Sequence, residues 1–252
     1  MMFKSLLVVW KDFKTNLYYH VGTLNYDGEK YMFVYTIQSS SHRKVREAIR
    51  NGYRPHPAFP DLHKEYVSNK LFLAFDRRIP SKDRMDYDEI LESLGLPKDA
   101  DRMDILRETR GMISGDPYSF EEPLRLYDNQ LLESNFYING MRHQNLGTDW
   151  FQKIKSGDLL YAVPEKDNDV DPYAVRIETS SGLRLGYIPG IYAQAVSALI
   201  ENDIPIKLTV QNIQPNKAPQ WWVHVHLKSQ LNLQALTKNS KRELEDLILK
   251  VA

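Results

Sequence analysis

The chain has 252 residues, of which 42% are apolar and 26% are charged, a composition typical of a globular protein and unlike that of a disordered one. It contains no cysteine, which excludes disulfides, a thiol nucleophile and cysteine-ligated zinc or iron–sulfur sites. Lysine plus arginine equals aspartate plus glutamate at 33 each, and this weighs against a protein that grips nucleic-acid phosphates without regard to sequence, because such proteins are usually basic.

The apolar stretches of the sequence are short. The first one, Leu6–Trp10, is too short for the apolar region of a secretory signal and runs directly into Lys11 and Asp12. No stretch reaches the length of about 18 apolar residues that a membrane-spanning helix needs. The sequence therefore predicts no membrane span and, by default, a cytoplasmic protein.

The start of the chain is expected to combine strands with one short helix. The β-branched and aromatic residues of Leu6–Trp10 and Tyr31–Ile37 indicate strands, and Tyr26–Glu29 supplies a turn between them. A serine-rich loop then leads to a helix at Lys44–Asn51, which Gly52 ends.

The next segment has a helical pattern. Apolar residues at helical spacing indicate helices at Asp86–Leu94 and Asp99–Thr109. Gly111–Pro123 is rich in glycine and proline and is expected to be a connection. We therefore expect an N-terminal domain of mixed strands and helices over residues 1–125.

After this connection the apolar period returns to two, the period of strands. One helix, Ile191–Asn202, interrupts the strands, and a final amphipathic helix at Ser240–Val251 lies in a separate C-terminal element, residues 231–252. The prediction is an α+β fold in which a small, OB-like, partly open β-barrel with one or two helices spans residues 133–230. The expected strands are Phe136–Asn139, Leu159–Val163, Ala174–Glu178, Arg184–Ile188, Lys207–Asn212 and Trp222–Leu227.

Four segments of this half carry a recognisable order of residues. Phe136–His143 ends in a Gly-apolar-Arg-ring step, and Lys155–Leu159 is a turn that starts a strand. Pro164–Val175 has the spacing E-x-x-N-x-x-D-x-x-A-V, and Gly182–Pro189 ends in Gly-Tyr-Ile-Pro before a helix. From Phe136 to Leu227 this order resembles the HIRAN domain, which occurs alone in bacteria and fused to helicase-like ATPases in eukaryotes.

The resemblance implies an OB-like barrel whose cleft binds single-stranded DNA, particularly at its end. By position, Arg142 would contact a phosphate or a base, and Asp171 would accept a hydrogen bond from a terminal hydroxyl, with Asn168 beside it on the same loop. His143 stands where DNA-binding members have a ring that stacks on a base, and Tyr187 belongs to the same implied site. The chemistry is sound, because a guanidinium suits phosphate and an acidic acceptor selects a free hydroxyl.

Two positions depart from the pattern of the DNA-binding members. Val170 stands where a second stacking tyrosine is expected, and stacking on a ring is worth about 1–3 kcal/mol per base. Gly190 stands where a basic residue is expected, and Glu133–Lys228 carries nine Lys/Arg against ten Asp/Glu. The sequence thus keeps the Arg142/Asp171 pair without the second ring and without a basic surface.

A second order of segments lies in the first half, and these segments are Leu7–Trp10, Val21–Leu24, Phe33–Tyr35, Pro57–Leu62, Leu71–Phe75 and Asp104–Glu108. The order resembles the N-terminal subdomain of HipA-type toxin kinases. The kinase core would follow this subdomain, but here its place is taken by the HIRAN-like module. The resemblance therefore implies no phosphotransfer activity.

Two acidic or histidine-containing segments invite a metal-binding interpretation. Asp167, Asp169 and Asp171 fit positions 1, 3 and 5 of a calcium-binding EF-hand loop, but position 6, which needs a glycine, is Pro172. We therefore favour a ligand-binding loop, or else a solvated turn. His224 and His226 share one face of a strand, yet no third ligand stands nearby in sequence, so we expect ordinary surface histidines and no metal or cofactor.

Two further features have both a structural and a functional interpretation. Trp221 and Trp222 point to opposite faces if extended, so one would be core and the other could be a stacking platform. Arg43–Arg54 is the most basic stretch, and it is either a solvated helix face or a patch that contacts phosphates.

The sequence contains no Ser-His-Asp order, Walker loop or zinc-protease motif, and we expect a protein without enzymatic activity. Two function classes stay open. The first is an accessory protein that binds single-stranded DNA or DNA ends in repair, restriction or phage defence. The second is a protein-interaction module of a toxin–antitoxin or regulatory complex. A nuclease is a third, less favoured class.

Overall fold

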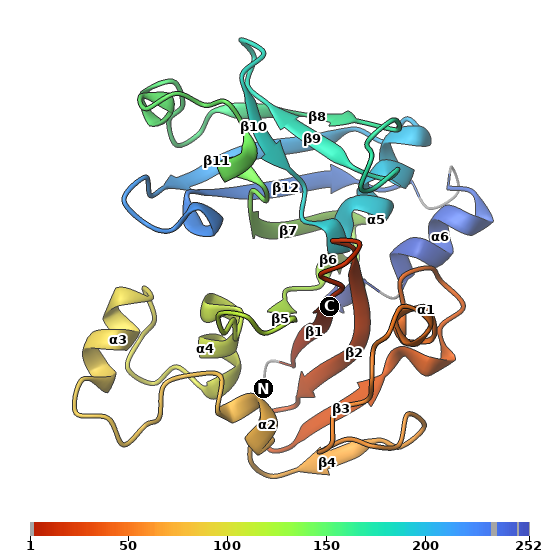
Figure 1. The fold of residues 1–252 in the computed structure, drawn as a ribbon, viewed down its shortest axis with the longest axis vertical. Helices are drawn as coiled ribbons and strands as arrows, with labels where there is room; N and C mark the ends of the chain where they lie inside the picture. The colour runs from red at the N-terminus through yellow and green to blue at the C-terminus, as the bar shows by residue number, and fades with distance from the viewer. Residues whose placement is uncertain (1–2, 233–235, 246, 252) are drawn as a thin grey trace. The chain divides into compact units, whose positions relative to one another are not determined.

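The computed structural model describes residues 3–232, 236–245 and 247–251, whose helices and strands fall into two units, Met1–Glu122 and Pro123–Ala252 (Figure 1). Both units contain helices as well as strands, so the expected α+β class is confirmed. Within the described ranges, no helix is both long enough and apolar enough to cross a bilayer.

The first unit is built on an antiparallel sheet of five strands in the order β4-β3-β2-β1-β5. Aromatic and β-branched residues favour strands here, and the four central residues of β1 are buried in a row, so both of its faces are covered. The strands are β1 (Lys4–Lys11), β2 (Tyr18–Tyr26), β3 (Tyr31–Tyr35), β4 (Tyr66–Ser68) and β5 (Tyr118–Glu121).

The core of this unit is aromatic. The ring centroid of Phe33 lies 4.6 Å from that of Phe59 and 5.4 Å from that of Phe75, and the helices contribute buried residues to the same cluster. The helical segments are η1 (Thr36–Gln38), α1 (Val45–Arg50), α2 (Leu73–Asp76), α3 (Tyr87–Ser93) and α4 (Arg102–Thr109). Three of them, α1, α3 and α4, lie where the sequence predicts helices.

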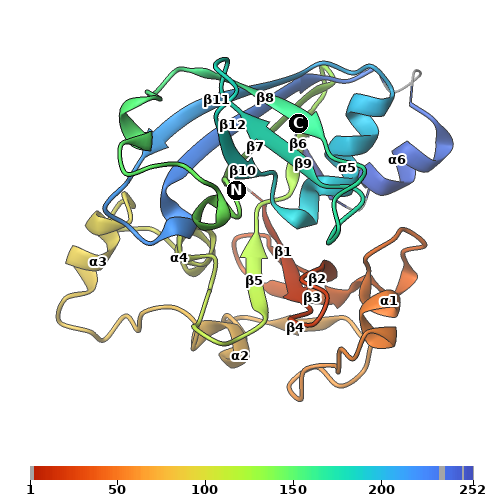
Figure 2. The same ribbon diagram turned by 45° about the horizontal axis from the view of Figure 1, so that its top comes forward.

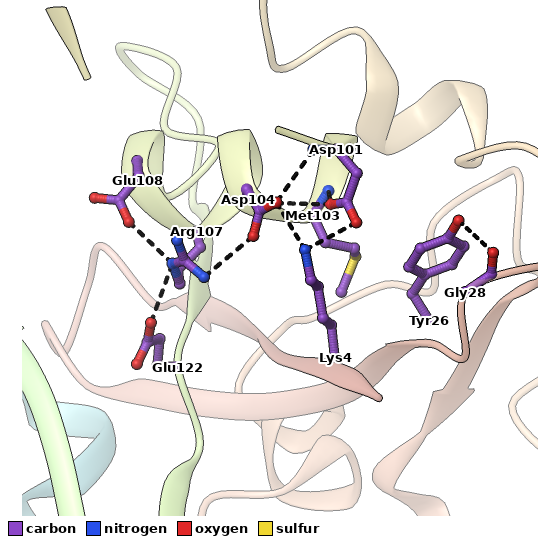
Figure 3. A network of polar contacts seen from close by, with 9 residues as sticks. All are labelled: Lys4, Tyr26, Gly28, Asp101, Met103, Asp104, Arg107, Glu108 and Glu122. Atoms are coloured by element: carbon purple, nitrogen blue, oxygen red, sulfur yellow. Dashed lines mark hydrogen bonds and ion pairs between the residues drawn. The ribbon is translucent and has the colours of Figure 1, made fainter. Parts of the chain in front are cut away.

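Helix α4 is fixed to the sheet through charged side chains (Figure 3). Asp101 caps the helix by accepting hydrogen bonds from backbone N–H groups of its first turn, and the Asp104 carboxylate accepts one from the Asp101 N–H in return. Lys4 of β1 reaches both carboxylates, at 2.9 Å from Asp101 and 2.7 Å from Asp104. One turn further, Arg107 joins Asp104 to Glu122. The cap and the Lys4 ion pairs therefore hold the first turn of the helix, and Arg107 holds its last turn.

We expect Asp101→Ala to weaken α4 by about 1–2 kcal/mol, because an N-cap carboxylate is lost together with one partner of Lys4. The measurement is amide hydrogen exchange, in which protection of the α4 amides should fall roughly 5- to 30-fold. The matched control is Asp99→Ala, since Asp99 is an exposed aspartate just before the helix. Equal exchange in the two variants would contradict the assigned cap.

The second unit is built on a sheet of eight strands in the order β10-β9-β8-β11-β12-β7-β6-β13. Figures 1 and 2 show that this sheet is curled. Burial alternates along β7 and β12, so one face of the sheet lines the core and the other does not. The strands are β6 (Leu124–Tyr127), β7 (Leu131–Tyr137), β8 (Leu159–Pro164), β9 (Val175–Glu178), β10 (Arg184–Tyr187), β11 (Ile206–Ile213), β12 (Val223–Gln230) and β13 (Ile248–Val251).

Among the residues that the structure describes, the sheet closes into a barrel through a single bridge. Just after β7, the Asn139 N–H donates to the Tyr187 carbonyl of β10 at 2.9 Å, and the Tyr187 N–H donates to the Asn139 carbonyl at 2.8 Å. On the other side of the ring, β8 and β11 share only two register pairs, Leu160 with Leu208 and Leu159 with Thr209. The expected partly open barrel is therefore confirmed, and it has two weak seams.

Helix α5 (Gly190–Glu201) supplies much of the core of this unit. Eight of its twelve residues are buried, and the ring of Tyr192 packs on that of Phe136 with centroids 5.8 Å apart. The remaining helical segments are η2 (Met141–His143), η3 (Trp150–Gln152), η4 (Pro219–Trp221) and α6 (Lys238–Glu245).

The C-terminal helix predicted over Ser240–Val251 is wrong in its second half. Helix α6 covers Lys238–Glu245, and Ile248–Val251 forms strand β13, which pairs in parallel with β6. The spacing of the apolar residues fits a helix, but pairing with the free edge of β6 gives Ile248 and Val251 a strand environment that β-branched residues favour.

Candidate nucleic-acid interface

We call the side of the barrel where Asn139 bridges to Tyr187 of β10 the closing seam. Glu165 is the centre of its polar contacts. It follows β8, and its carboxylate accepts hydrogen bonds from the Tyr187 hydroxyl at 2.8 Å, the Asn168 side-chain amide at 2.8 Å and the Arg176 guanidinium at 2.8 Å. Arg176 also donates to Glu178 on the same strand. One carboxylate thus connects β9, β10 and the loop after β8.

This arrangement favours a charged Glu165. Partial burial acts to raise the pKa of the Glu165 carboxyl, but the hydrogen bonds from Asn168, Tyr187 and Arg176 outweigh it and hold the pKa below its ordinary value. Burial raises the pKa of Tyr187, and the hydrogen bond to Glu165 raises it further. The pair therefore stays as a neutral phenol donating to a carboxylate.

The loop between β8 and β9 is ordered by its own side chains. The Asn168 side-chain oxygen accepts from the backbone N–H groups of Val170 at 3.0 Å and Asp171 at 3.1 Å. The Asp171 carboxylate accepts from the Tyr173 N–H at 2.8 Å, and Asp171 is 9% exposed. Such side-chain turns fix the chain without a regular element, so Asn168 and Asp171 have defined positions relative to Glu165.

Arg142 and His143 lie beside the closing seam because they directly follow the closing bridge in the chain. They lie in η2, which follows Asn139 and Gly140, and a Cβ at Gly140 would lie 3.5 Å from the ring of Tyr187. Both side chains are exposed, and the Arg142 Nε donates to the His143 Nε2 at 2.9 Å.

The sequence-predicted residues therefore form two groups that meet at one strand. Asn168, Asp171 and Tyr187 are joined through Glu165, while Arg142 and His143 form a pair on the turn beside Tyr187.

Sequence reasoning gave no role to Glu165 or Arg176, although Glu165 is the first residue of the E-x-x-N-x-x-D spacing. A signal was available, because Arg176 and Glu178 stand two apart on a strand and therefore share a face.

A ring cluster lies on the sheet next to the turn. Tyr137 of β7 packs against Trp221 with centroids 4.9 Å apart and against His224 of β12 at 4.6 Å. Trp221 ends η4, which lies beside η2. Trp222 instead packs on Trp150 at 5.2 Å. Both tryptophans are half-buried, so the expectation that one would be core and the other a free platform is wrong, because η4 is helical and does not alternate.

The other candidate segments are engaged in structural contacts. His226 lies 3.0 Å from the Asn135 side-chain oxygen and 3.6 Å from Glu133. In the basic stretch, Arg43 and Lys44 are buried, and the Arg46 guanidinium donates to the Ile37 carbonyl. Within the described ranges, no three His, Asp or Glu side chains gather as metal ligands.

Known proteins provide an independent view of this unit. No curated protein matches the chain. Among solved structures, the HIRAN domain of human HLTF is similar at 15% identity and a TM-score of 0.37, over 48% of this chain and 92% of that one. A protein from Lactobacillus plantarum is similar at 17% identity and a TM-score of 0.35, over 38% of this chain and 89% of that one. Residues 131–233, which hold β7 to β12 and all the residues of the candidate interface, match the family model of the HIRAN domain.

Proposed function

We propose that the second unit binds single-stranded DNA or DNA ends, and that the chain is a non-enzymatic accessory protein in DNA repair, restriction or phage defence. The observation that carries this proposal is the closing seam, where Glu165 holds the Asn168/Asp171 loop next to the strand that flanks the Arg142 turn. The match of residues 131–233 to the HIRAN domain supports it.

Each side chain has a chemical role in this proposal. The exposed Arg142 guanidinium binds a phosphate through charge-assisted hydrogen bonds, and His143 stacks on a neighbouring base. The Asp171 carboxylate accepts a hydrogen bond from the terminal hydroxyl, which an internal nucleotide lacks. Glu165 positions the loop, and Asn168 beside Asp171 and Tyr187 on β10 complete the binding site. Tyr137, Trp221 and His224 offer further rings beside the turn, where stacking contributes about 1–3 kcal/mol per base.

The test is the affinity of a fluorescein-labelled single strand measured against salt. Because Arg142 is the one basic residue we assign to phosphate, we expect a shallow slope of log affinity against log salt, near −0.7 for each phosphate contacted. Arg142→Ala should weaken binding about tenfold at low salt, as expected for loss of a charged hydrogen bond, and should flatten the slope. Lys238→Ala, which removes an exposed charge at the start of α6, is the matched control and should leave both unchanged.

The alternative function is a protein-interaction module of a toxin–antitoxin or regulatory complex, with the HipA-like resemblance of the first unit pointing to that setting. The neutral overall charge favours it. The same salt series separates the two functions, because absence of binding at low salt would leave the interaction module as the better account.

The non-enzymatic part of the proposal has its own test. Incubation of the labelled strand with the protein and Mg²⁺ or Mn²⁺ should leave the strand uncut. Cleavage that follows the protein through purification and is lost in Asp171→Asn would contradict it.

A further inference from the structure

The second weak seam of the barrel forms an open groove. Strands β8 and β11 are antiparallel and pair where β8 begins, and they separate toward the end of β8 and the start of β11, where β8 stays paired with β9 and β11 with β12. The space between them has a volume of about 450 Å³, which is within the range of about 300–1,000 Å³ typical of binding pockets. Its walls come from Leu159–Ala162 and from Ile204–Leu208, with Ile200 and Asp203 from the end of α5.

Main-chain groups on both walls face this groove. In an antiparallel strand the N–H and C=O of alternate residues point to the same side. On β11, Val210 exchanges hydrogen bonds with Gly157 and Asp158 on the β8 side, so Ile206, four residues earlier, points to that side as well. Directly after β8, the Glu165 N–H donates to the Ala174 carbonyl, directly before β9, so the main chain of Ala162, three residues earlier, points to the opposite side, toward β11.

In the described part of the chain, these groups have no strand partner across the groove. Within the described residues, the register between β8 and β11 contains no pair beyond Leu160 with Leu208. Ala162 and Ile206 would be the next pair outward, and both line the groove. The opening is about three residues long on the β8 side, or roughly 10 Å at 3.3 Å per residue. The end of β8 and the start of β11 are thus two short strand edges without a neighbouring strand inside the sheet.

The exposed side chains at the rim of the opening are apolar, and the charged side chains that line it add to zero net charge. Leu159 is 54% exposed and Tyr161 is 55% exposed, both on the outer face of β8. Asp203 and Lys207 contribute one charge of each sign. A free strand edge beside exposed apolar side chains is a template for another strand, and the balanced charge favours an uncharged one.

We propose that this groove binds an extended, uncharged segment of a partner protein by strand addition, with apolar residues at alternate positions of the segment. Main-chain hydrogen bonds to Ala162 and Ile206 supply affinity, and Leu159, Tyr161 and Ile200 receive the apolar side chains. This is the established chemistry of peptide recognition by an exposed sheet edge. The proposal rests on the open seam alone, so it stands or falls separately from DNA binding.

The probe is a displayed library of random heptapeptides, selected on the full chain and counter-selected on the double variant Leu159→Lys/Tyr161→Glu. Both replaced side chains are more than half exposed, so the variant should fold. The expected result is a set of peptides with apolar residues at alternate positions, each losing at least tenfold in affinity on the double variant. The matched control is Val67→Lys in β4, where the side chain is 51% exposed and binding should be unchanged.

A second measurement separates strand addition from simple apolar docking. The best peptide is N-methylated at its odd or at its even positions. Since successive N–H groups of a strand that lies between two edges face opposite edges, each of the two patterns should lose at least tenfold in affinity.

Three results would overturn the proposal. The first is a failure to select any peptide that depends on the groove. The second is full affinity retained with either methylation pattern. The third is a dimer of the chain, seen by sedimentation, that the double variant abolishes, because a second copy would then be the occupant.

Discussion

Gly186→Ala is expected to destabilise the second unit by roughly 3–5 kcal/mol. A Cβ at this position would overlap the Asn139 carbonyl oxygen and lie 2.8 Å from the Ile138 Cγ2. Because one clashing atom is backbone, β10 must move away, which breaks the two hydrogen bonds of the closing bridge at about 0.5–1.5 kcal/mol each. The positive φ of +150° adds backbone strain of about 1–3 kcal/mol for a residue with a side chain.

The matched control is Gly182→Ala in the turn before β10. Gly182 also has a positive φ, +81°, but a Cβ there meets nothing within 4 Å, so only strain of about 1–2 kcal/mol is expected. Guanidinium unfolding followed by fluorescence of the tryptophans at 150, 221 and 222 measures the difference. Equal midpoints for the two variants would show that the close approach of β10 to Asn139 is not needed.

Glu165→Gln is expected to destabilise the second unit by about 2–3 kcal/mol, the range for loss of charged hydrogen bonds. Whichever way the new amide turns, its NH₂ faces a donor, because Arg176 donates to one oxygen and Tyr187 and Asn168 donate to the other. The matched control is Glu201→Gln, whose ion pair with Lys166 is exposed and should be worth at most about 1 kcal/mol.

The same carboxylate gives stability a defined pH dependence. The pKa of Glu165 is lowered on folding, so its contribution is fully present above the unfolded pKa, about 4.3, and is lost as the pH falls through the folded value. Wild type should therefore lose stability more steeply than Glu165→Gln below about pH 4.3. An equal fall in the free energy of unfolding of the two proteins as the pH is lowered would contradict the assigned hydrogen bonds.

The strands and the long helix of the second unit follow from local signals. Six period-two segments become β7 to β12, and the apolar stripe after Pro189 becomes α5, since each element presents one face to the core. The same reasoning fails where pairing decides the structure. Ile248–Val251 has helical spacing but becomes a strand on β6, and Tyr118–Glu121 lies in an expected connection but pairs with β1.

The candidate interface could be predicted only in part for the same reason. The motif placed Asn168, Asp171 and Tyr187 in one site, and the structure joins them through a carboxylate that had no assigned role. Contacts between β9, β10 and the loop are non-local, so no spacing reveals that Arg176 shares Glu165 with Tyr187. The open seam at Ala162 and Ile206 is likewise invisible in sequence, because it depends on where β8 leaves β11.

The most direct test of the proposed function compares one labelled single strand with free terminal hydroxyls against the same strand with both ends blocked. Fluorescence anisotropy at low salt should show tighter binding of the free strand. Asp171→Asn, which keeps an oxygen for the Tyr173 N–H but removes the charge, should reduce this preference without changing affinity for the blocked strand. Absence of binding by either strand, or equal binding of both in wild type and variant, would contradict recognition of DNA ends at this seam.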